Sequence, residues 1–191
     1  MGNARRSKLV ATLAVLVSCG AVLGAGTLAA AAPTTGVSPG SGPYLVDVDG
    51  GRPLFVLPVL RPGHVVRRCI SVVYRGTGPT GMRLFGRTRG RGLPSRLELT
   101  VVRGHLPAGT RFPSCAGFEP DARTYGPGEK GVLYEGTLAR YPDTAAGGIP
   151  DPRDRWRSGE RHAYKFVVKL RGWNGAQGLS ARQEFIWQAV R

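Results

Sequence analysis

The sequence predicts an all-β protein, an antiparallel two-sheet sandwich of about seven to nine strands, jelly-roll or immunoglobulin-like, after an N-terminal signal helix. Short segments rich in Val, Leu, Tyr, Phe and Trp alternate with Gly and Pro, a pattern typical of strands joined by turns. After residue 43, no stretch of about ten residues keeps a helical apolar period. The length fits one sandwich domain, which we expect at residues 44–191.

The first 31 residues have the order of charges and apolar residues of an export signal. Arg5, Arg6 and Lys8 precede an uncharged run from Leu9 to Ala32. Ala29 and Ala31 supply the small side chains that a signal peptidase requires, so we expect a signal peptide at residues 1–31. A flexible linker rich in Gly, Pro and Ser follows at residues 32–43. The expected location is therefore secreted, extracellular or associated with the cell wall, with no membrane contact after cleavage.

Two alternatives to cleavage stay open. The apolar run is long enough to remain as an uncleaved anchor in a bilayer. Leu16-Val17-Ser18-Cys19 also resembles a lipobox, in which Cys19 would be acylated, although the apolar run continues beyond that cysteine.

Alternating residues predict the strands in order. In Arg161–Arg171, Tyr164, Phe166 and Val168 share one face with Leu170, and the charged residues share the other, so one face should be buried. Phe185, Trp187 and Ala189 alternate in the same way and predict a closing strand. Pro58 marks an edge or a break in its segment. The other expected strands are Tyr44–Val48, Leu54–Leu60, Val65–Tyr74, Met82–Phe85, Arg96–Val102 and Val132–Leu138.

Two cysteines remain after the signal, and in an oxidising compartment we expect Cys69 and Cys115 to form a disulfide. In Val65–Tyr74, Cys69 has the parity opposite to the apolar residues. The disulfide should therefore lie outside the main core and tether the Pro107–Tyr125 loop to the outer face of the strand. A second long loop is expected over Arg140–Gly159.

The chain is strongly basic. Without Arg5, Arg6 and Lys8 the 27 Lys and Arg residues fall to 24, against 12 Asp and Glu, so the net charge falls from +15 to +12. Such an excess attracts acidic polysaccharides and other envelope polyanions. The densest basic tract, Gly86–Gly92, carries Arg87, Arg89 and Arg91, which are candidate polyanion-binding residues. Solvated arginines, enriched by the codon usage of a GC-rich genome, explain the same composition.

No catalytic or metal-binding pattern accompanies these features. The chain contains three isolated histidines, His64, His105 and His162. An isolated histidine near a strand end is usually exposed, so we expect these three at the surface. Neither HExxH nor GxSxG occurs. We expect no catalytic residue, no metal site and no cofactor. Asp47 and Asp49 suit an Asp-Gly turn better than a calcium site, because calcium requires six to eight oxygen ligands. Trp173 lies in a turn signal and is either an exposed aromatic platform or a cap on the edge of the sandwich.

A series of short motifs resembles the TasA/camelysin group of exported bacterial proteins, in its actinobacterial branch. The resemblance covers nearly the whole mature chain and implies a jelly-roll-like sandwich at the cell surface or in the extracellular matrix. It also implies self-association by strand addition, for which the Pro33–Gly42 linker and Tyr44–Val48 are the candidate segment. The motifs are Asp47–Gly50, Leu54-Phe55, Pro62-Gly63, Arg68–Ile70, Val73–Gly76, Leu133–Leu138, Trp156, Gly159-Glu160, Tyr164–Phe166, Gln177–Ala181 and Phe185–Trp187.

The sequence thus favours a non-enzymatic surface or matrix protein whose partners are further copies of itself or anionic envelope polymers, with no specific nucleic acid. The alternative is a basic binding module for acidic cell-wall glycan or another polyanion. A third hypothesis, an exported peptidase, rests on the label of camelysin-type proteins alone, because the chain carries no metal motif to support it.

Overall fold

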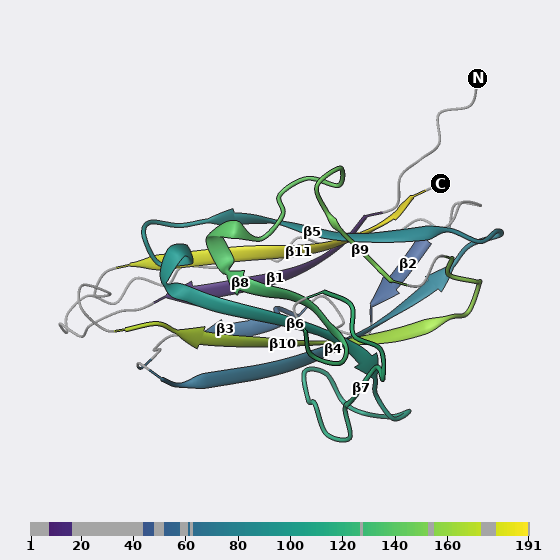
Figure 1. Cartoon of the computed structure of the whole chain (residues 1–191), viewed down its shortest axis with the longest axis horizontal. Coiled ribbons are helices and arrows are strands. Elements are labelled where there is room, and N and C mark those ends of the chain that lie inside the picture. Colours follow the sequence, from purple (N-terminus) through teal and green to yellow (C-terminus); the bar gives the residue numbers. More distant parts are fainter. Residues whose placement is uncertain are drawn as a thin grey trace.

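The computed structural model describes residues 8–16, 44–47, 52–57, 61, 63–126, 128–152, 155–172 and 179–190. Over these residues the chain forms two β-sheets that face each other as the layers of a sandwich (Figure 1). The predicted all-β sandwich is confirmed. None of the described residues belongs to a helix that is long and apolar enough to cross a bilayer.

The first sheet, sheet A, has five strands in the order β3-β1-β11-β5-β9. The second, sheet B, has the order β2-β4-β10-β6-β7, and β8 also pairs with β6. The strands of sheet A are β1 (Lys8–Leu16), β3 (Phe55–Leu57), β5 (Gly81–Arg89), β9 (Ile149–Pro150) and β11 (Ser180–Val190). Those of sheet B are β2 (Tyr44–Asp47), β4 (Val65–Arg75), β6 (Leu97–His105), β7 (Glu119–Pro120), β8 (Val132–Thr137) and β10 (Arg161–Leu170). Two short 3-10 helices, Pro94–Arg96 and Leu138–Arg140, complete the described elements.

The connectivity is that of a jelly roll. From β3 onward, strands of one sheet alternate with strands of the other, except that β6, β7 and β8 all lie in sheet B. With β1, β2 and β7 set aside, the sheets contain the strands β3, β11, β5 and β9 and the strands β4, β10, β6 and β8. This is the four-on-four arrangement of two Greek keys. Of the two sandwich types that the sequence predicts, the structure has the jelly roll.

Aromatic side chains from both sheets meet in the core. Phe166 on β10 and Phe185 on β11 are 0% and 1% exposed, and their ring centroids lie 4.3 Å apart. Tyr164 and Trp187 repeat the contact two residues along each strand, with centroids 5.3 Å apart. Because both pairs join sheet A to sheet B, the predicted alternation on the last two strands is also what closes the sandwich.

Each predicted strand has a counterpart, and the differences lie at the boundaries. β3 is described over Phe55–Leu57, and residues 58–60 of the expected strand lie outside the described residues, while β5 continues to Arg89. β7 and β9 have two residues each and carry too little pattern to be predicted.

The expected N-terminal helix is wrong for residues 8–16, which form strand β1. β1 lies between β3 and β11 and pairs with β11 over nine positions. An uninterrupted apolar run has no polar face to distinguish a helix from a buried strand, so the sequence pattern alone could not decide between them.

The disulfide joins Cys69 to Cys115, with the two Cα atoms 5.1 Å apart. As predicted, it lies outside the main core, in a separate small cluster with Leu106 and Ala163. The backbone N–H of Cys69 also donates to the carbonyl of Pro113 at 3.0 Å. The bond therefore fixes residues 106–118 against the outer face of sheet B.

Replacing both cysteines, as Cys69→Ser with Cys115→Ser, should lower the free energy of unfolding by about 4 kcal/mol, because the unfolded chain regains the entropy of a long open loop. Urea denaturation of both proteins measures the difference. The far-ultraviolet spectrum should remain that of a β-protein, since the main core does not include the disulfide. Loss of the sheet signal in the variant would contradict this assignment.

Candidate functional site

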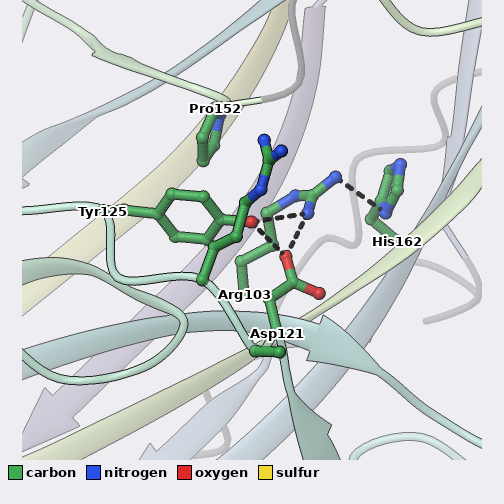
Figure 2. A pocket seen from close by; sticks show the side chains of 7 residues that line it. Arg103, Asp121, Tyr125, Pro152 and His162 are labelled. Atoms are coloured by element: carbon green, nitrogen blue, oxygen red, sulfur yellow. Dashed lines mark hydrogen bonds and ion pairs between the residues drawn. The ribbon is translucent and has the colours of Figure 1, made fainter.

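A buried polar network lies at one end of sheet B, around Arg103. Arg103 is on β6 and has the parity of the core residues Leu97, Leu99 and Val101, so its side chain points inward and is 6% exposed. A charged group at such a position needs partners, because burying an unpaired guanidinium is very costly. The partners come from other segments of the chain, as Figure 2 shows for Asp121, Tyr125 and His162.

Arg103 donates in several directions. Its Nε binds Asp151 Oδ2 at 2.9 Å, and its Nη1 forms an ion pair with Asp121. Nη2 lies 2.9 Å from His162 Nδ1. The Tyr125 hydroxyl donates to Asp121 Oδ2 at 2.8 Å, which ties the segment after β7 to the same guanidinium.

Asp151 is the most deeply buried acid of the network, with a side chain that is 0% exposed. Its Oδ2 accepts from Arg103 and from the Tyr164 hydroxyl, the latter at 2.8 Å. Burial alone lowers the pKa of Arg103, but Asp151, Tyr164 and Asp121 outweigh it, so that pKa is raised. Burial, followed by the charge of Asp151, raises the pKa of Tyr164 well above its ordinary value. At neutral pH the network therefore contains a charged arginine and a protonated tyrosine.

His162 belongs to this network, and its expected exposed position is wrong. The side chain is 13% exposed, and the ring packs edge-on against Trp156 with centroids 4.4 Å apart. Nδ1 faces a guanidinium N–H and must accept, so the proton lies on Nε2, which donates to Glu160 Oε1 at 2.9 Å. Burial and the nearby charge of Arg103 lower the pKa of His162, against the opposing effect of Glu160.

A cavity of about 500 Å³ opens beside the network. The described residues that line it include no Ser, Thr or Cys that a base could activate, and both ring nitrogens of His162 are already hydrogen-bonded. Nucleophilic catalysis requires a base in contact with a nucleophile, and this geometry does not provide that pair. The network is better suited to holding loops in place than to reacting. The lining residues are Arg103, Asp121, Ala122, Arg123, Tyr125, Pro152 and His162.

The described residues contain no group of three or more His, Cys, Asp or Glu side chains that is arranged to hold a metal ion. Asp47 ends β2, whereas Asp49 and the turn predicted there lie outside the described residues. Trp173 also lies outside them.

The predicted polyanion-binding residues lie on sheet A. Arg87 and Arg89 have the outward parity of β5, Arg91 follows in the turn, and all three are exposed. Arg87 is opposite Glu184 on β11, while Arg89 is opposite Arg182. The structure therefore brings the three arginines to one accessible region, and their role remains a prediction.

The network was missed in the sequence because its members are far apart along the chain. One signal was present: Arg103 continues the alternation of Leu97, Leu99 and Val101 and is the first charged residue at an inward position of that strand. The sequence could have indicated that Arg103 needs a buried acid. It could not indicate that Asp121 and Asp151 supply it, since both follow very short strands in long loops.

Substituting Asp151→Ala should destabilise the fold by about 3 kcal/mol or more, because the guanidinium of Arg103 stays buried and loses its most buried partner. Chemical denaturation measures the change. The matched control is Asp143→Ala, at an exposed position, which should change stability by about 0.5 kcal/mol or less. Similar effects for the two variants would contradict the network's structural role.

The stability of the protein should also depend on the protonation of His162. Since the pKa is lowered in the folded state, the unfolded chain takes up the proton first, and stability should fall as the pH drops below about 6.5 toward the folded pKa. The His162→Gln variant should lose this component. Thermal unfolding of both proteins between about pH 5 and 8 measures the difference between the two curves, and parallel curves would contradict the assignment.

Comparison of the chain with protein-family models, with curated proteins and with solved structures found no match. A functional assignment therefore depends on the geometry of this chain. Within that geometry the described residues form the buried polar network with its adjoining cavity, and a set of exposed arginines on and after β5.

Proposed function

We propose that the chain is an exported, non-enzymatic surface or matrix protein that self-associates by strand addition. The observation that carries the proposal is the position of β1. Residues 8–16 form a strand inside sheet A, yet they belong to the segment whose sequence is that of a cleavable export signal.

β1 has backbone partners on both sides. It is antiparallel to β11 from Lys8 opposite Gln188 to Leu16 opposite Ser180, and parallel to β3 over three positions. In the jelly-roll order β3 and β11 would be neighbours, so β1 occupies an inserted position between them. A strand in that position satisfies one backbone edge of β11 along most of its length.

Cleavage after Ala31 would remove β1 and leave this edge of β11 without a partner. Phe185 and Trp187, which close the core, lie on that strand. An open edge of this length beside an apolar core readily pairs with a strand from another chain. Export and processing would therefore create the surface through which copies associate.

The proposed donor is the new N-terminus of a neighbouring copy, within residues 32–43. β2 is paired with β4 of its own sheet, so Tyr44–Asp47 is not free to be donated, and the donor must precede it. Between Pro33 and Pro39, residues 34–38 keep every backbone N–H and can extend the ladder next to β11.

A size measurement tests the proposal. The full chain is expressed in a host that exports it, the N-terminus of the product is determined by mass spectrometry, and its mass is followed by light scattering across concentration. The processed protein should form oligomers that grow with concentration. A synthetic peptide of residues 8–16, in excess, should return it to monomers, because it fills the position beside β11.

The matched control is the same peptide with Leu13→Pro, which lacks a backbone donor in the middle of the strand and should not dissociate the oligomers. A processed protein that is monomeric at every concentration and does not bind the peptide would show that β3 and β11 close directly on each other. That outcome would overturn strand addition.

A further inference from the structure

A second cavity, of about 400 Å³, lies on the outer side of sheet B and is lined by three arginines. Its volume falls within the range of small-molecule sites, roughly 300–1,000 Å³. Arg161 is on β10, Arg111 is in the loop held by the disulfide, and Arg52 precedes β3. The described residues that line it are Arg52, Ser71, Pro107, Gly109, Thr110, Arg111, Phe112 and Arg161.

No acidic side chain is among the described residues that line this basic pocket. Elsewhere in the chain, Arg103 pairs with Asp121 and Asp151, and Arg171 pairs with Glu98. Arg111 and Arg161, in contrast, form no ion pair with any described residue, and both are exposed. Two guanidinium groups that line one cavity and form no ion pair with the described residues create a local positive potential, which an anion would relieve.

The pocket is held in place by the fold. Ser71 and Arg161 lie on the outward faces of adjacent strands, where Ala163 is directly opposite Ser71. The wall that contains Arg111 is fixed by the disulfide and by the bond from Cys69 N–H to the Pro113 carbonyl. Arg52 donates to the carbonyl of Phe112 at 3.4 Å and lies over that ring, 5.3 Å from its centroid. The side chain of Arg52 and the backbone that carries Arg111 and Arg161 are thus held in place before a ligand arrives.

The lining also indicates the class of ligand. Ser71 is 6% exposed, and its hydroxyl has no hydrogen bond to any described residue, so it remains available to a polar ligand. Phe112 is buried and covered by Arg52, so its ring cannot serve as a platform on which a nucleic-acid base stacks. A concave site with hydroxyl and guanidinium donors suits an oxyanion on a sugar better than a stacked base.

We infer that this basic pocket binds the carboxylate or phosphate group of an anionic saccharide. The inference goes beyond the proposed function, because the pocket lies on sheet B and does not involve the position of β1 on sheet A. It also assigns saccharide binding to Arg52, Arg111 and Arg161, which are different residues from the exposed arginines of β5.

Calorimetric titration of the exported protein with trigalacturonate and with glucose 1-phosphate tests the inference and separates the two sources of charge. At least one of them should bind, neutral maltotriose should not, and the affinity should fall as salt is added. Absence of binding by both anionic sugars would overturn the inference, as would tighter binding of duplex DNA at the same residues. The titration is repeated on the monomer, which is obtained by adding the peptide of residues 8–16. Sugar binding by the monomer is then measured separately from self-association.

The decisive comparison uses two double variants with the same loss of charge. Arg111→Gln with Arg161→Gln should weaken binding about tenfold or more, since two charge-assisted hydrogen bonds are lost. Arg140→Gln with Arg157→Gln, at two exposed arginines that do not line the pocket, should change it by less than about twofold. Equal losses in both variants would show that binding depends on overall charge and would overturn the pocket. The Cys69→Ser, Cys115→Ser variant should also bind more weakly, and unchanged affinity would refute the role of the tethered loop.

Discussion

The packing of β10 against β11 across the two sheets is the contact on which the remaining structure depends. These strands are consecutive in the described order, each is central in its sheet, and their aromatic side chains meet in pairs. Aromatic pairs of this kind combine large buried areas with a preferred geometry. β10 then carries β4 and β6 on its two sides, and β11 carries β1 and β5. The positions of the polar network, of the β1 strand and of the basic pocket all follow from these two strands.

The sequence was informative wherever burial is periodic. Alternation predicted β10 and β11 with their inward residues, and parity alone placed Cys69 outside the main core, where the structure has it. The pattern failed where it carries no period, as in residues 8–16. It also failed for the polar network, because loops of irregular sequence bring Asp121 and Asp151 to Arg103, and nothing in the sequence specifies how such loops close.

The two proposed binding surfaces lie on different sheets and use different physics. Beside β11, an unpaired backbone edge would bind a strand through main-chain hydrogen bonds. The affinity would depend on the backbone geometry of that strand rather than on the salt concentration. In the basic pocket, fixed guanidinium groups would select charge at short range, and recognition would weaken in salt. A protein that combined both would link copies through one face and hold an envelope polymer with the other.

The alignment of β10 with its neighbouring strands is tightly constrained. Arg161 faces the basic pocket, His162 joins the buried network, and Phe166 fills the core, all from one ladder with alternating sides. A slip of the ladder by a single position would exchange the inside for the outside. The arginine would then be buried, and the phenylalanine would face water. Core, network and pocket therefore share one alignment, and a chain misaligned in this way would lose all three together.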